Sequence, residues 1–270
     1  MSAGSEQIRD SQRELQPAAP ALGGFKNLVD KENREWLAGF SWLAHGAIWL
    51  ILVAGTPLVV SFIRAQGDNS PQDVNEIGAL LYFVMGSVAT VIAVVAKTQS
   101  AIIGERQMGT AAWVLSKPAS RKAFLLAKFV VHLRWLLVLT LGVPAVVFYA
   151  IVPTMSGLPI AILPFLGGFG ILALGMAFYL ALSLFLGTVF GSRGPVAAIV
   201  FGFFAGGIML SQYAAWLTAA FPWLFWESAY YLVAANREIP AIGFSAIILT
   251  AVWTVALIAA ALWKFQRSEI

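Results

Sequence analysis

The sequence contains no cysteine, and lysine, arginine, aspartate and glutamate together make up only 11% of its residues. The lack of cysteine excludes disulfides, thiolate metal sites and cysteine nucleophiles. Hydrophobic residues make up 60% of the chain, whereas soluble domains have roughly 45–50% apolar and about 25% charged residues. These proportions predict an integral membrane protein.

Motifs for catalysis and nucleotide binding are also missing. No Gly-x-x-x-x-Gly-Lys-Ser/Thr loop occurs, so we do not expect the chain to hydrolyse ATP by that route. No acidic residue interrupts a long apolar run, and the only histidines, His45 and His132, lie near the ends of such runs. We therefore expect neither an enzyme nor a cofactor or metal site. The net charge of +4 is small and scattered, which gives no reason to expect a nucleic-acid partner.

Six uncharged runs are long enough to cross a membrane. A helix needs about 20 residues to cross roughly 30 Å of hydrocarbon, and the continuous apolar character of these runs does not fit the alternation of barrel strands. The sequence thus predicts an all-α integral membrane protein with six transmembrane helices. We place them at about 42–63, 77–96, 129–152, 162–190, 196–221 and 241–263.

The chain divides into a tail, an entry segment and a transmembrane domain. Residues 1–27 are polar and rich in Gln, Ser, Ala and Pro, which predicts a disordered tail. Residues 28–41 mix charged with aromatic and aliphatic residues, as in an interfacial elbow helix or, equally, a solvated helix before the membrane. The six-helix domain then covers residues 42–267.

Lysine and arginine gather on one side of the predicted membrane. They precede the first span, separate spans two and three, and follow span six, while only Arg64 and Arg237 fall on the other side. The positive-inside rule therefore predicts that both termini are cytoplasmic. We expect a multi-pass protein of the cell (plasma) membrane, in particular a prokaryotic inner membrane.

Residues 97–122, between spans two and three, form the one charged internal segment. A short helix is expected over about 102–115, with Glu105 at its positive end and Lys117 at its negative end. Pro118 cannot continue the helix. We expect this amphipathic helix to lie outside the bilayer.

Six residues in and after this segment stand at a characteristic spacing: Glu105, Gly109, Thr110, Pro118, Arg121 and Lys128. This order of an acid, a Gly-Thr pair, Pro-x-x-Arg and a downstream lysine resembles the cytoplasmic loop of ABC type 2 permeases, the membrane subunits of ATP-driven exporters. Ala111 and Ala112 stand where that family often has a leucine followed by an acid.

The resemblance implies a permease subunit, most simply a homodimer with a second copy, that works with two cytoplasmic ABC ATPase subunits. It implies that the loop 97–122 carries a coupling helix that docks on an ATPase subunit, and that Arg121 and Lys128 anchor span three at the interface, although the positive-inside rule alone would explain both. The coupling residues that it implies are Glu105, Arg106, Gly109, Thr110, Trp113 and Pro118.

Two other classes of function remain open, and the cargo is not specified by the sequence. A membrane anchor for a cytoplasmic complex would need no transport path. An ion-coupled secondary transporter or channel would have to use the few polar residues within spans, namely Ser87, Thr90, Ser211, Gln212 and Thr250.

Three further patterns predict local structure. Pro57, Pro144 and Pro164 are expected to kink their spans. The pairs Gly187/Gly191 and Gly202/Gly206 predict close packing of helices, within the subunit or across a dimer. Residues 222–240 are rich in Trp and Tyr, which indicates either an aromatic belt at the membrane interface or a re-entrant gate.

Overall fold

The protein is described by a computed structural model that covers residues 22–99, 101–107, 120–234 and 238–267. All regular structure within those ranges is helical, as predicted. Of the predicted disordered tail, residues 1–21 lie outside the described residues, and the first described helix, α2 (Phe25–Leu37), begins within the last three residues of that tail.

Six helices in the described part of the chain are long and apolar enough to cross a membrane, which confirms the predicted number and a multi-pass membrane protein. Spans one and three are each built from three consecutive helices, and the other four from one helix each. The elements are α3 (Ser41–Trp49), η1 (Leu50–Gly55) and α4 (Thr56–Ala65); α5 (Pro71–Thr98); α8 (Arg121–Leu136), η2 (Leu137–Gly142) and α9 (Val143–Ser156); α10 (Ile162–Val189); α11 (Arg193–Ser211); and α13 (Ala241–Arg267).

The fifth span is shorter than predicted. It ends at Ser211 rather than near residue 221, and the chain continues through two short 3₁₀ helices, η3 (Ala215–Ala219) and η4 (Pro222–Leu224), into α12 (Phe225–Val233). These residues are apolar but do not continue the helix, so composition alone placed the end of the span too late.

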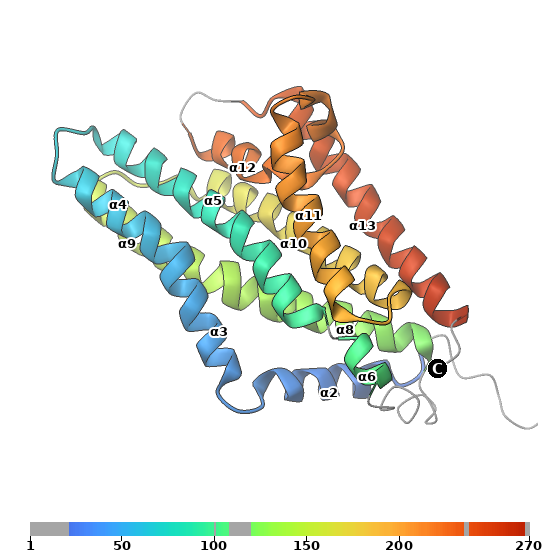
Figure 1. Cartoon of the computed structure of the whole chain (residues 1–270). Helices are drawn as coiled ribbons and strands as arrows, with labels where there is room; N and C mark the ends of the chain where they lie inside the picture. Colours follow the sequence, from blue (N-terminus) through green and yellow to red (C-terminus); the bar gives the residue numbers. More distant parts are fainter. Residues whose placement is uncertain (1–21, 100, 108–119, 235–237, 268–270) are drawn as a thin grey trace, which may run out of the picture.

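The bundle has a buried centre and an apolar periphery. In the 18-residue apolar stretch of each span, 61% of the residues are buried in α10, but only 22% are buried in α11 and in α13. Figure 1 shows α10 behind α5 and α11, with α13 along one side. Large hydrophobic side chains such as Val255 and Trp263 of α13 are exposed. A soluble protein rarely exposes so much apolar surface, whereas lipid tails would cover it.

Four aromatic rings form the centre where α5, α9 and α10 meet. Tyr82 and Phe83 of α5 pack against Phe148 and Phe165, with ring centroids 5.2–5.9 Å apart. Gly168 of α10 makes this approach possible, because a Cβ there would lie 2.6 Å from the Phe83 ring. Burial and ring packing together fix the position of α5 against α10.

Spans one and three each contain a π-helical segment that ends in a glycine and is followed two residues later by a proline. The two sequences are similar: Leu-Ile-Leu-Val-Ala-Gly-Thr-Pro at 50–57 and Leu-Val-Leu-Thr-Leu-Gly-Val-Pro at 137–144. The ring of Pro57 or Pro144 would clash with the carbonyl four residues earlier in a regular α-helix. A wider turn relieves that clash, so the kinks expected at Pro57 and Pro144 take the form of π turns. The kink expected at Pro164 is not supported, because this proline lies in the first turn of α10, where proline does not interrupt the helix. The segments η1 and η2 are in contact.

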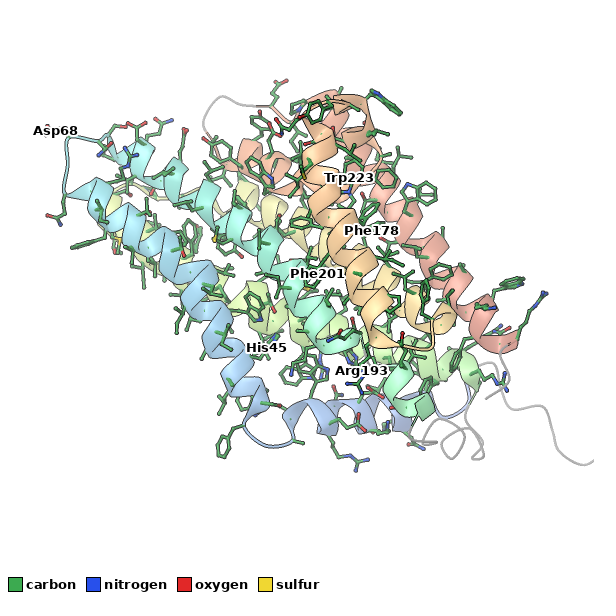
Figure 2. All side chains as sticks on the ribbon, viewed as in Figure 1. His45, Asp68, Phe178, Arg193, Phe201 and Trp223 are labelled. Carbon is green, nitrogen blue, oxygen red and sulfur yellow. The ribbon has the colours of Figure 1, made fainter. Side chains whose placement is uncertain are left out.

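The two ends of the bundle differ. Helix α2 runs across one end, where α6 (Ile103–Gln107) and the last turn of α13 also lie, and we call it the α2 end; α12 lies toward the opposite end (Figure 1). Asp68 and Arg193 mark the opposite end and the α2 end respectively (Figure 2). The chain turns from α2 into α3 at Gly39, whose φ of 66° is readily adopted only by glycine.

Candidate functional site

Segments from three distant parts of the sequence meet at the α2 end. Helix α2 packs along α8, and α6 lies beside both (Figure 1). The backbone N–H of Ser120, just before α8, donates to the carbonyl of Gly23, just before α2, at 2.9 Å. The Ser120 side chain also caps α8 by accepting from the N–H of Ala123. The starts of α2 and α8 are thus tied together.

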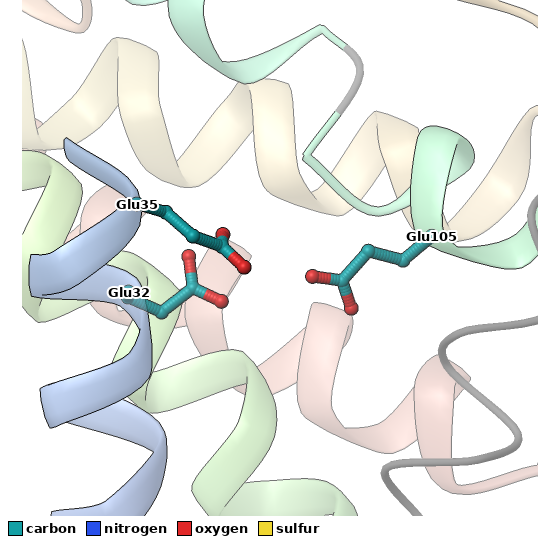
Figure 3. A group of neighbouring side chains, drawn as sticks. All are labelled: Glu32, Glu35 and Glu105. Atoms are coloured by element: carbon teal, nitrogen blue, oxygen red, sulfur yellow. The ribbon is translucent and has the colours of Figure 1, made fainter. Parts of the chain in front are cut away.

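Five charged side chains from these segments form one ion cluster, made of Lys31, Glu32, Glu35, Glu105 and Lys128. The Lys128 ammonium donates to Glu32 Oε1 at 2.8 Å and to Glu105 Oε1 at 2.9 Å. The Lys31 ammonium lies 2.8 Å from Glu105 Oε1 and 3.1 Å from Glu35 Oε1. Figure 3 shows the carboxylates of Glu32 and Glu35 on one side facing that of Glu105 on the other. Glu105 therefore connects α6 to both α2 and α8.

The centre of the ion cluster is buried. Lys128 is 2% exposed, Glu32 3% and Glu105 9%. Charges removed from water are tolerated only when they are closely paired, and removing one partner leaves the other charge uncompensated. The close pairing of Lys128 with two carboxylates satisfies this requirement.

The ionisation of the two α2 residues is set by opposing effects. Burial alone would raise the pKa of the Glu32 carboxyl, but the charge and hydrogen bond of Lys128, together with the nearby charges of His132 and Lys31, hold this pKa below its usual value. Burial likewise disfavours the charged form of Lys31, but hydrogen bonds and negative charge from its three glutamate neighbours raise the pKa of this lysine above its usual value. Both side chains are therefore charged at neutral pH.

The three carboxylates do not need a metal ion to explain them. Single oxygens of Glu32, Glu35 and Glu105 lie within 4.8 Å of one another, a separation that one cation could span. The ammonium groups of Lys31 and Lys128 already supply two positive charges at these oxygens. We therefore interpret the group as an ion cluster.

Trp36 extends the contact between α2 and the bundle. Its buried ring packs edge-on against His45 of α3 and His132 of α8, at centroid distances of 5.8 and 5.7 Å, and stacks on Trp135 at 6.4 Å. The Lys97 ammonium, at the end of α5, lies 4.8 Å from the centre of the same ring, within the range of a cation–π contact. One α2 side chain thus contacts residues from spans one, two and three.

Both histidines are packed between helices. His132 Nδ1 lies 2.9 Å from the carbonyl oxygen of Lys128, and His45 Nε2 lies 3.2 Å from the Thr140 hydroxyl in η2. The second contact links the first span to the π-helical segment of the third.

Arginines add two contacts at the same end. Arg134, which is exposed, donates to the Asn33 side chain of α2 and lies over the ring of Trp135. Arg121 donates to the carbonyl of Gln266 at 2.9 Å, at the C-terminus of α13, where the helix dipole favours a positive charge.

The structure brings together two of the predicted site residues, Glu105 and Lys128, and places them in the buried ion cluster. Arg121 lies apart from the cluster, against α13. Arg106 belongs to α6, and only its backbone is among the described parts of the structure. The predicted coupling residues Gly109, Thr110, Trp113 and Pro118 lie outside the described residues, as does most of the helix expected over 102–115.

Sequence reasoning missed the contribution of α2 to this site. Lys31, Glu32 and Glu35 were interpreted only as charges of the entry segment, an interfacial elbow helix or a solvated helix before the membrane. A signal was present, because Glu32 stands four residues after Leu28 and four before Trp36, which places it on the apolar face of the helix. Those three residues are the buried ones of α2. An acid on an apolar helix face requires a buried partner.

At the opposite end, the aromatic segment is partly incorporated into the bundle. Trp223 and Phe225 are buried, and the indole of Trp223 covers Gly207 of α11, where a Cβ would lie 2.1 Å away. Tyr230 of α12 donates to Glu76 Oε2 at 3.2 Å. By contrast, a Cβ built at Gly206 would have no atom within 4 Å from the rest of the described chain, apart from the nearby backbone of its own helix. The tight glycine contact of α11 is therefore one residue from the predicted position.

Comparison with known proteins identifies a family without assigning an activity. No curated protein matches the chain. Residues 46–270 match a family described as protein of unknown function (DUF2705). The match covers spans two to six, the first span from residue 46 onward, and the α6 and α8 parts of the ion cluster. The chain belongs to the DUF2705 family.

Proposed function

We propose that the chain is the permease subunit of an ATP-driven ABC exporter, which couples ATP hydrolysis by two separate cytoplasmic ATPase subunits to export or force transmission across the membrane. The proposal rests on the resemblance of the segment from Glu105 to Lys128 to the loop of ABC type 2 permeases. Six membrane-spanning helices are compatible with it.

The observation that carries the proposal furthest is the position of Glu105. Its carboxylate lies 2.9 Å from the Lys128 ammonium of α8 and 2.8 Å from the Lys31 ammonium of α2. A displacement of the segment between spans two and three would therefore act directly on α2 and on span three. Such a connection suits a subunit that converts the movement of a partner into a rigid-body movement of its spans.

This geometry refines the role proposed for Glu105. A carboxylate that is 9% exposed and paired with two lysines offers little to an external partner. In our proposal Glu105 transmits the movement to α2 and α8. Docking on the ATPase then falls to the other predicted coupling residues, Arg106, Gly109, Thr110, Trp113 and Pro118.

The proposal also specifies how the chain is oriented in the membrane and which partners it has. The α2 end faces the cytoplasm, as the distribution of lysine and arginine predicts. The other partners are the lipid bilayer and a second copy of the chain. The membrane is the plasma membrane, of the prokaryotic inner-membrane type.

The test is co-purification of the tagged chain from membranes of its native host, followed by measurement of ATP hydrolysis. We expect an ABC ATPase subunit to co-purify, and we expect Glu105→Gln to reduce the stimulation of its ATPase activity by the permease. The matched control is Glu35→Gln, which removes a charge from the exposed edge of the same cluster and should retain most of the stimulation. Purification of a folded chain without any ATPase, or equal loss in both variants, would contradict the proposal.

A further inference from the structure

A small cavity lies between α5 and α10, and is lined by residues from the interior of both helices. It has a volume of about 10 Å³, and its lining includes the apolar side chains of Phe204 in α11 and Phe225 in α12. Three hydroxyl-bearing residues also line it: Ser87 and Thr90 of α5 and Tyr179 of α10. No charged residue is among those that line it in the described part of the chain.

Two of these hydroxyl groups have no hydrogen-bond partner among the residues that the structure describes. Thr90 is 3% exposed and Tyr179 is 2% exposed, and neither Thr90 Oγ1 nor Tyr179 Oη is paired with a protein atom. Buried hydroxyls are almost always satisfied by protein or by ordered water, because an unsatisfied one loses its hydrogen bonds to solvent without replacement.

The Tyr179 hydroxyl cannot easily turn toward another partner. Its ring packs edge-on against Phe178 and Phe204, with centroid distances of 5.3 and 5.9 Å. Thr90 is held on the buried face of α5. Both hydroxyls therefore remain at the wall of the same cavity.

We propose that this cavity binds one ordered water molecule, which bridges Thr90 Oγ1 and Tyr179 Oη and has the Ser87 hydroxyl as a third partner. The cavity volume is of the order that one water requires, roughly 10–15 Å³, and buried waters typically have about three polar partners. The uncharged lining selects a neutral guest, because a desolvated cation would need compensating negative charge.

This site also bears on the candidates for ion-coupled transport. Ser87 and Thr90 are two of the polar residues that such a mechanism would have to use, and the water site gives them a different role. A bridging water adds a second polar link between α5 and α10, which are already joined by the buried hydrogen bond between Thr98 Oγ1 and Ser183 Oγ at 2.8 Å. The proposed water site does not depend on the proposed coupling to an ATPase.

Thermal unfolding of the purified chain in detergent, followed by tryptophan fluorescence, tests the proposal. Thr90→Val and Tyr179→Phe each remove one hydroxyl with little change of shape. With a water in place, each should lower the unfolding midpoint by about 2–4 °C, the shift expected for the loss of one hydrogen bond in a chain of this size. The double variant should lose less than the sum, because both substitutions remove the same bridge.

Tyr82→Phe is the matched control. Tyr82 lies on α5 but donates directly to the carbonyl of Leu141 at 3.0 Å, so its substitution should be additive with Thr90→Val. Single variants that raise the midpoint would overturn the proposal, because they would show that an empty cavity leaves the hydroxyls unsatisfied. Additive losses for Thr90→Val and Tyr179→Phe would also overturn it.

A second measurement distinguishes water from a cation. The unfolding midpoint of the unmodified chain is compared in sodium chloride and in choline chloride at equal ionic strength. We expect equal midpoints. A sodium-dependent increase that disappears in Thr90→Val would overturn the water assignment in favour of a bound cation.

Discussion

Replacing Lys128 by methionine tests how much the ion cluster contributes to stability. The substitution keeps an unbranched side chain of similar length but removes the ammonium that bonds Glu32 and Glu105. Glu105 retains Lys31 at 2.8 Å, whereas Glu32 retains only the longer contact to Lys31, at 3.4 Å. The buried Glu32 carboxylate is therefore the group left without adequate compensation.

The expected cost is that of breaking a buried ion pair from one side, about 3–5 kcal/mol. At roughly 2–4 °C for each kcal/mol in a chain of this size, the unfolding midpoint should fall by about 10 °C. Tryptophan fluorescence can follow the transition in detergent, because the chain has 10 tryptophans and Trp36 packs beside the cluster.

Two further variants make the interpretation specific. Lys122→Met removes an exposed lysine from the first turn of α8 and should shift stability by no more than about 0.5 kcal/mol. Adding Glu32→Leu to Lys128→Met should recover much of the loss, because an apolar pair leaves no unpaired charge on that side. If Lys128→Met behaves like Lys122→Met, or if the double variant is no more stable than the single one, the reasoning about the ion cluster is wrong.

Two more predictions follow from the same structure. Because the pKa of Glu32 is lowered and that of Lys31 is raised, the stability that these groups contribute should stay constant at neutral pH. It should fall in acid, as the pH drops below the ordinary glutamate pKa of 4.5, and in base only above the ordinary lysine pKa of 10.5. Unfolding midpoints measured across pH check this, and a loss of stability between about pH 6 and 8 would contradict it. Gly207→Ala should destabilise the folded chain by about 1–3 kcal/mol through overpacking against Trp223. The control, Gly206→Ala, should leave the stability of the monomer nearly unchanged. Equal effects of the two substitutions in the same unfolding assay would refute the packing at Gly207.

The sequence predicted the membrane class and the number of spans because both depend on composition and length. Its main error in the spans was the end of the fifth helix, where the residues after Ser211 are apolar but form 3₁₀ helices instead. Hydropathy measures the environment of a segment and is insensitive to a break in its backbone hydrogen bonds.

The paired π-helical segments illustrate a signal that was visible but incompletely interpreted. Pro57 and Pro144 predicted kinks, yet the shared spacing of leucine, glycine and proline in spans one and three indicates the same kind of turn in both. A proline shows that a regular helix is disturbed, whereas the form of the disturbance depends on the neighbouring helices.

The candidate site was predicted in part. The spacing singled out Glu105 and Lys128, but as residues with separate roles, because sequence distance does not show that α2, α6 and α8 meet at one place. Their direct contact and the contribution of Glu32 depend on tertiary packing. The roles of Arg106 and of Gly109, Thr110, Trp113 and Pro118 stay predictions.

The central claim is that the segment between spans two and three faces the cytoplasm, where an ATPase could act on it, and cysteine labelling tests this most directly. The chain has no cysteine, so Met108→Cys and Asp68→Cys each introduce a single target without further changes. Asp68, at the end opposite to α2, is the control (Figure 2). In intact cells, a membrane-impermeant maleimide should label the cysteine at 68 and not the one at 108, which should react only after the membrane is opened. Labelling at 108 from outside intact cells would contradict the account.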